Sequence, residues 1–150
     1  MEQQDLELER RVWQRISGGE QVCQGVPSLR EMEQRCRESA SIFRQLAQGC
    51  TGSMRDGLQE LFRREYENAL TLMGMRVLSG EEPEKMPCCP WSKTGVCRAL
   101  ALAYRTSCQA RQDYARSGQG EYGPVFAAME RSEVEKMGKL LALIGMCKGG

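Results

Sequence analysis

The chain has 150 residues with 21 Lys and Arg against 20 Asp and Glu, a formal net charge of +1. This length is typical of one domain, and such a balanced charge provides no electrostatic surface for nucleic acid. No apolar run reaches the roughly 20 residues that a membrane helix needs, and the first residues are too charged for a secretory signal. We therefore expect a soluble cytoplasmic protein with no membrane or nucleic-acid partner.

The cysteine and histidine content excludes several classes of site. Eight cysteines are present, at positions 23, 36, 50, 88, 89, 97, 108 and 147. Their density is below that of disulfide-stapled secreted proteins, and the helical patterning supplies a core without staples, so we expect reduced thiols. Histidine is absent, which removes the base of Cys-His and Ser-His catalysis. Phosphate-binding and dinucleotide-binding glycine motifs are absent too.

The N-terminal region, residues 1–27, is predicted to contain one short helix and a loop. Residues 6–16 have apolar side chains near helical spacing, and Gly18 and Gly19 end the pattern. We expect Trp13 to pack this helix across the rest of the domain. Gly and Pro residues predict a loop over residues 20–27.

Two long helices are predicted next. Ser28 followed by Glu31 has the spacing of a capping box, and an apolar stripe then continues to Gly49. A second stripe runs from residue 54 and closes at Gly80. Two polar residues, Glu65 and Asn68, lie on this second stripe, whereas Arg63 and Glu67 lie off it.

The second half of the chain repeats this layout. Residues 81–95 are rich in proline and are too interrupted for a helix, which predicts a long crossover. A third helix is predicted over residues 96–117 and a turn over residues 118–123. The fourth begins near Pro124 and ends at residues 144–145, with Glu133 and Lys136 on its stripe. Two helix pairs joined by a long crossover predict an all-α, four-helix bundle over residues 28–150.

Two helical segments then suggest a family. Residues 65–69 and 133–136 each place a Glu three residues before a polar residue, Asn68 and Lys136. Together with the sequence EYGPVF at residues 121–126, this layout resembles the ferritin-like superfamily, nearest to the rubrerythrin-type domains of small bacterial proteins, over residues 28–145. The resemblance implies a ferritin-like up-down bundle with a long crossover between its second and third helices. In that family, Glu-x-x-His stands where residues 65–68 and 133–136 lie.

The resemblance also implies where metal ligands would lie. The family's first and third helices each supply a Glu seven residues before an aromatic residue. Counting back from Phe43 and Tyr114 gives Cys36 and Ser107. Glu38 is a poor substitute, because two residues along a helix turn it about 200° away from the stripe. The six positions are therefore Cys36, Glu65, Asn68, Ser107, Glu133 and Lys136.

Only two of these six residues are carboxylates. A di-iron or di-manganese site of this family needs four carboxylates and two imidazoles, so the set implies that the site and its oxidoreductase chemistry are lost. We expect no iron or manganese cofactor. Two buried carboxylates still need compensation. Lys136 either places its ammonium between Glu65 and Glu133, with Asn68 and Ser107 completing hydrogen bonds, or extends outward to solvent.

These residues leave three hypotheses for the function of the protein. The leading one is a degenerate ferritin-like bundle that is non-catalytic and acts as a binding or structural protein, with an unidentified protein partner or as a homodimer through an apolar helix face. The first alternative is a metal-dependent oxidoreductase or metal store that uses Glu65 and Glu133 to hold iron or manganese.

The second alternative is a zinc or thiol redox protein centred on the proline-rich crossover. Its ligands would be Cys88, Cys89 and Cys97, joined in space by Cys50 or Cys147. The spacing differs from the paired Cys-x-x-Cys pattern of structural zinc sites, which favours reduced thiols without a metal.

Overall fold

The structure is a computed structural model that describes residues 25–82, 86 and 95–149. Its elements are the α-helices α2 (Leu29–Gln48), α3 (Gly52–Leu78), α4 (Val96–Arg116) and α5 (Gly123–Gly149), and the short 3₁₀ helix η2 (Ser117–Gln119). The described part of the chain contains no strand, so the all-α prediction is confirmed. The predicted helix at residues 6–16, with Trp13, lies outside the described residues. None of the described helices is long and apolar enough to cross a membrane.

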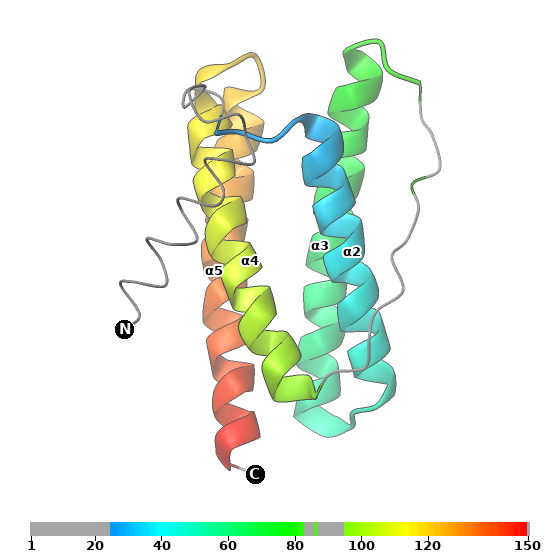
Figure 1. The fold of residues 1–150 in the computed structure, drawn as a ribbon, viewed down its shortest axis with the longest axis vertical. Coiled ribbons are helices and arrows are strands. Elements are labelled where there is room, and N and C mark those ends of the chain that lie inside the picture. Colours follow the sequence, from blue (N-terminus) through cyan, green and yellow to red (C-terminus); the bar gives the residue numbers. More distant parts are fainter. Residues whose placement is uncertain (1–24, 83–85, 87–94, 150) are drawn as a thin grey trace.

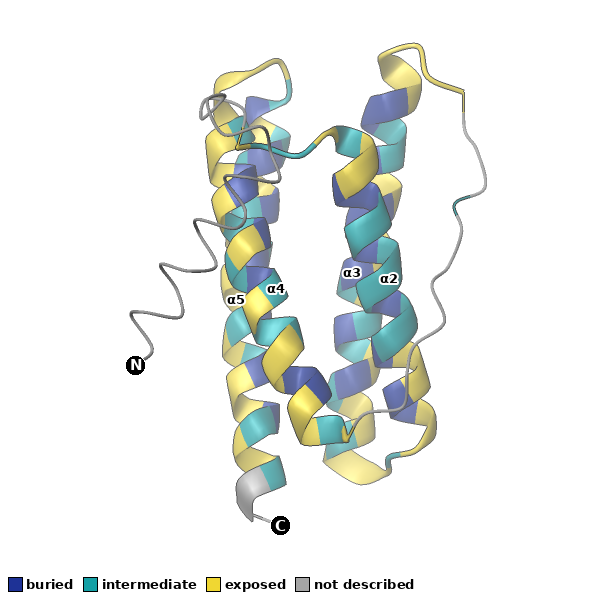
Figure 2. Ribbon diagram, in the orientation of Figure 1, coloured by how far each residue is buried: buried dark blue, intermediate teal, exposed yellow. Residues whose placement is uncertain are grey.

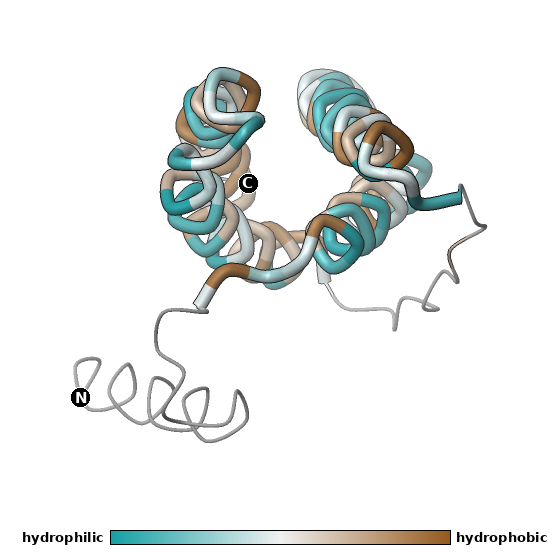
Figure 3. The backbone as a smooth tube through the Cα atoms, turned by 90° about the horizontal axis from the view of Figure 1, so that it is seen from above, coloured by the Kyte–Doolittle hydropathy of each residue, from teal (hydrophilic) through white to brown (hydrophobic). Residues whose placement is uncertain are grey.

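The four helices form two antiparallel hairpins, α2 with α3 and α4 with α5 (Figure 1). Seen from above, the two hairpins form the two sides of the molecule (Figure 3). Helices α3 and α4 run in the same direction, so the chain returns from one end of the bundle to the other between Leu78 and Val96. This arrangement agrees with the long crossover expected between the two helix pairs.

Local capping chemistry explains where α2 begins. The Ser28 hydroxyl accepts a hydrogen bond from the Glu31 backbone N–H at 3.1 Å, and the Ser28 N–H donates to Glu31 Oε1 at 3.0 Å. This is the predicted capping box. The hydrogen bonds from the Ser28 backbone and hydroxyl lower the pKa of Glu31, because they favour its ionised form.

The end of α5 differs from the prediction. We expected the helix to stop at residues 144–145, but it continues to Gly149. The helix passes through Gly145, where an added Cβ atom would meet only open space. Cys147, beyond this glycine, still packs against the apolar core. Helix breaking by glycine is a weak local preference, and tertiary packing overrides it here.

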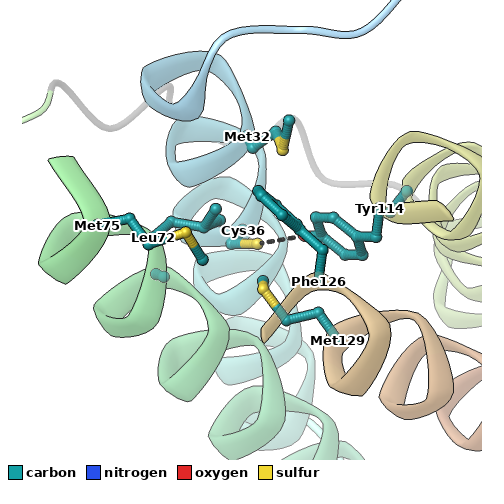
Figure 4. Close-up of a cluster of buried hydrophobic side chains, with 9 residues drawn as sticks. Met32, Cys36, Leu72, Met75, Tyr114, Phe126 and Met129 are labelled. Carbon is teal, nitrogen blue, oxygen red and sulfur yellow. Dashed lines mark hydrogen bonds between the residues drawn. The ribbon is translucent and has the colours of Figure 1, made fainter. Parts of the chain in front are cut away.

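The apolar core is divided into two clusters, and each contains residues of all four helices. Buried positions recur along every helix (Figure 2). One cluster consists of Met32, Cys36, Ala69, Leu72, Met75, Ala110, Tyr114, Phe126 and Met129 (Figure 4). The other consists of Phe43, Leu46, Ala47, Leu58, Leu61, Ala99, Leu100, Leu140 and Leu143. Along α3, α4 and α5, buried polar residues stand between the members of the two clusters. The bundle therefore has a polar middle layer.

Candidate functional site: a buried polar layer

The six positions singled out in the sequence are all buried in the bundle. Their exposed fractions are Cys36 2%, Glu65 2%, Asn68 8%, Ser107 1%, Glu133 1% and Lys136 4%. By contrast, Arg63 and Glu67 are exposed, as their place off the stripe predicts. Helical periodicity therefore identified the inward-facing polar residues of the middle layer.

Lys136 lies between two carboxylates from different hairpins. Its ammonium donates to Glu65 Oε1 on α3 and lies 2.8 Å from Glu133 Oε1 on its own helix. This geometry matches the first of the two orientations considered from the sequence. Extension to solvent is wrong, because only 4% of the Lys136 side chain is exposed.

Asn68 and Ser107 have different roles from each other. The Asn68 side-chain amide donates to Glu133 Oε2 at 3.4 Å, as expected. The hydroxyl of Ser107 is buried, yet among the described residues it makes no hydrogen bond to the two carboxylates or to Lys136. The predicted contribution of Ser107 is therefore wrong. Its position on α4 was inferred from the apolar stripe and by counting back from an aromatic residue, and both of these indicate a helix face but no partner.

Glu133 is the least satisfied member of the layer. Its Oε1 atom is 2.8 Å from the Lys136 nitrogen, but within the described structure it accepts no hydrogen bond of good geometry. Burial raises the pKa of Glu133 to about 7; Lys136 opposes this increase and the charge of Glu65 adds to it. Glu133 therefore gains or loses a proton near neutral pH.

Lys136, unlike Glu133, keeps its charge at neutral pH. Burial alone would lower the pKa of this ammonium, but the charges of Glu65 and Glu133 and the hydrogen bond to Glu65 keep it above its ordinary value. One lysine cation balances one carboxylate, and the proton on Glu133 neutralises the other. The layer thus reaches charge balance without any metal ion.

Cys36 connects the layer to the first apolar cluster. Its sulfur lies 3.4 Å from the hydroxyl oxygen of Tyr114, so that α2 contacts α4 (Figure 4). Burial, with a further contribution from Glu65, raises the pKa of Cys36 to about 12. Cys36 therefore remains a protonated thiol at neutral pH, which makes it a poor ligand and a poor nucleophile.

The donor set does not suit a dinuclear metal site. Within the described residues, no group of three or more His, Cys, Asp or Glu side chains is arranged to hold a metal ion. The Lys136 ammonium already contacts both carboxylates. A divalent ion bound there would face that cation and have only two carboxylates to neutralise it, so the site and the ion do not fit.

Comparison with protein-family models, curated proteins and solved structures finds no match to this chain.

A second buried ionic network was missed by the sequence reading. Glu33 is 1% exposed and accepts from Arg76 at 2.6 Å and from Arg37 at 2.8 Å, and Arg76 continues to Glu81 at 3.0 Å. The signal was available, because Glu33 precedes Cys36 by three residues and therefore shares its helix face. Its partner on α3 was beyond the reach of periodicity.

Arg35 and Asp113 form another ion pair that periodicity did not reveal. Arg35 Nη1 lies 2.6 Å from Asp113 Oδ2 and joins α2 to α4. The guanidinium carbon also lies 5.8 Å from the centre of the Tyr114 ring, within the range of a cation–π contact. By contrast, Glu38 is only partly exposed and accepts from Gln34 at 3.1 Å, rather than facing solvent freely.

Asn68 also links the layer to the surface. A cleft of about 340 Å³ is lined by Glu60, Arg63, Arg64, Glu67, Asn68 and Ser132. Asn68 therefore stands between this cleft and the Glu133 carboxylate to which it donates. Only one side chain separates the titrating carboxylate from a polar opening.

The candidate thiol site can be described only in part. Cys88 and Cys89 lie outside the described residues. The five described cysteines, at positions 36, 50, 97, 108 and 147, are free thiols.

Proposed function

We propose that this chain is a ferritin-like bundle of rubrerythrin type in which a salt bridge has replaced the metal site, and that it acts as a non-catalytic binding protein. The observation that carries the proposal is the contact of the Lys136 ammonium with Glu65 and Glu133. In the family layout, these two carboxylates would bind metal and position 136 would supply an imidazole.

The hairpin topology supports the family part of the proposal. Helices α3 and α4 are parallel, so the segment between Leu78 and Val96 connects opposite ends of the bundle. The six buried positions come from all four helices, as the ligands of a ferritin-like site do.

The binding part of the proposal is supported by the outer surface of α3. Tyr66, Leu70 and Val77 recur at helical spacing and are 44%, 39% and 44% exposed. Phe62 stacks on Tyr66 with ring centres 5.9 Å apart, which extends this stripe by one turn. A helix with a buried stripe and a second, exposed apolar stripe is suited to packing against another protein. We assign this surface to a second copy of the chain.

Elemental analysis of the purified native protein tests the loss of the metal site. We expect iron, manganese and zinc well below one ion per chain. Near-stoichiometric iron or manganese that is lost in both Glu65→Ala and Glu133→Ala would overturn the proposal in favour of a metal-dependent protein.

A rebuilt site tests the family layout. The variant Cys36→Glu, Asn68→His, Ser107→Glu, Lys136→His restores the family ligand types at the four altered positions. We expect it to bind Co²⁺ with the visible absorption of a protein-bound ion, because carboxylates and imidazoles then converge. The control keeps the first three changes but replaces Lys139 instead of Lys136, which leaves the cation in place. Equal Co²⁺ binding by both variants would contradict the layout.

Light scattering of the native protein at increasing concentration tests self-association. We expect a dimer that Tyr66→Ser with Leu70→Ser converts to a monomer. Thr71→Ser, at an exposed neighbouring position on α3, is the control and should leave the dimer intact. A monomeric native protein at all concentrations would refute this surface assignment.

A further inference from the structure

Three cysteines from separate parts of the chain meet at one end of the bundle. Cys50 lies in the turn between α2 and α3, Cys97 in the first turn of α4, and Cys147 near the end of α5. Cys50 and Cys147 both pack against the second apolar cluster, and so does Val96, the neighbour of Cys97. All three are free thiols, and Cys97 is the exposed one.

Two of these thiols lie close together. Cys97 interacts with Cys147 at short range, and Cys50 is close enough to act on Cys147 electrostatically. Burial, followed by the interaction with Cys97, raises the pKa of Cys147 to about 11. Cys147 is therefore protonated at neutral pH, and its S–H is available to donate to the Cys97 sulfur.

Cys97 has the features of the more reactive partner. It is the second residue of a helix of 21 residues whose N-cap, Gly95, provides no side-chain hydrogen bond. The backbone N–H groups of this first turn have no partner within the helix, so they can donate hydrogen bonds to an oxygen atom carried by the Cys97 sulfur. Cys97 is also exposed, so that an oxidant in solution reaches it.

We propose that Cys97 and Cys147 form a peroxide-sensitive dithiol in which Cys97 reacts first and Cys147 resolves the product as a disulfide. The Cys97 thiolate attacks one oxygen of hydrogen peroxide, which gives a sulfenic acid and hydroxide. The Cys147 sulfur then attacks the sulfenic sulfur, and the hydroxyl group leaves as water with the Cys147 proton. Peroxide is reduced by two electrons and the two thiols become one disulfide.

The fold gives this disulfide a structural consequence. It joins the start of α4 to the end of α5, at the end of the hairpin opposite η2. Cys50 is the competing thiol, but Cys147 interacts more strongly with Cys97 than with Cys50, which makes Cys147 the expected partner of Cys97. Neither thiol belongs to the polar layer, so the reaction of this pair does not depend on the proposed function.

Thiol titration and peptide mass spectrometry of the full chain, before and after treatment with hydrogen peroxide, test the proposal. We expect the loss of two thiols per chain and one linked peptide pair that contains Cys97 and Cys147. The oxidised protein should also melt roughly 5–15 °C higher, since the link constrains the unfolded chain. Reduction with dithiothreitol should reverse both effects.

Matched single replacements assign the roles. Cys97→Ser should prevent the two-thiol loss, whereas Cys147→Ser should leave a sulfenic acid on Cys97 that a dimedone probe captures. Cys50→Ser and Cys108→Ser should behave as the native protein. A native protein in which Cys97 accumulates as sulfenic acid, or pairs with a cysteine other than Cys147, would overturn the proposal.

Discussion

At the scale of single residues, the polar layer depends on which group holds a proton. Glu65 and Lys136 form a neutral pair, which leaves Glu133 as a buried carboxyl with one oxygen lacking a good hydrogen bond. Ionising such a group in a poorly solvated place is unfavourable. The layer is therefore most stable when Glu133 is protonated, and the stability of the folded protein should depend on pH.

The stability of the protein should fall as the pH rises from 5 to 8. Burial raises the pKa of Glu133 from 4.5 to about 7, so the folded chain keeps a proton that the unfolded chain releases between these values. The stabilising effect of this proton is complete below about pH 4.5 and is lost as the pH rises through about 7. The free energy of unfolding falls by about 3 kcal/mol over this range. Urea unfolding at several pH values measures the effect.

The control for this pH dependence is a pair of variants. Glu133→Gln should remove this pH-dependent component, whereas Glu135→Gln, at an exposed position on the same helix, should retain it. Indistinguishable pH profiles for Glu133→Gln and the native protein would show that another group is responsible.

At the scale of the helices, α3 and α5 approach each other closely at a glycine. A Cβ atom added to Gly57 on α3 would lie 2.7 Å from Leu143 Cδ2 on α5. Leu143 is 4% exposed and belongs to the second apolar cluster, so its side chain has little room to move. The contact requires a residue without a side chain even though glycine is unfavourable inside a helix.

Gly57→Ala should therefore be less stable than Gly74→Ala. Both positions lie inside α3, but nothing stands within 4 Å of a Cβ built at Gly74. Gly74→Ala should stabilise the protein by about 0.5–1 kcal/mol, and the overpacking at Gly57 should make the other variant about 1–3 kcal/mol worse than that. Chemical denaturation of the two variants tests this, and equal stabilities would contradict the close contact.

At the scale of the whole molecule, polar contacts join the two hairpins. Glu65 and Lys136 connect α3 to α5 through the buried layer, and Arg35 and Asp113 connect α2 to α4. Near the surface, Lys139 pairs with Glu60, again between α5 and α3. The hairpins are thus held in register by charges whose partners lie on the other hairpin.

Lys136→Met should destabilise the bundle by about 3–5 kcal/mol, because it leaves buried carboxylates without their cation. Lys139→Met removes an ion pair whose lysine is 35% exposed, and it should change stability by less than about 1 kcal/mol. Urea unfolding at pH 7 compares the two variants. Adding Glu65→Gln and Glu133→Gln to Lys136→Met should recover much of the lost stability. If Lys136→Met alone lost no more stability than Lys139→Met, a buried role for Lys136 would be contradicted.

Much of this fold could be predicted because its signals are local. The capping box at Ser28 and the stripes of apolar residues depend on neighbours within four positions, and the structure places the corresponding helices within a few residues of the prediction. The end of α5 was misplaced because Gly145 is a local breaker, while the packing of Cys147 that overrides it is a distant contact.

The amino-acid sequence is enough to indicate which polar residues face the interior, since Glu65, Asn68, Glu133 and Lys136 recur with the helical period. The contacts between the packed helices were needed to show that Lys136 turns inward, that one Glu133 oxygen lacks a hydrogen bond, and that Ser107 does not bond to this group. Periodicity assigns a residue to a face of its own helix, whereas an ion pair depends on the rotation and height of two helices relative to each other. Those quantities are set by the packing of all four helices together.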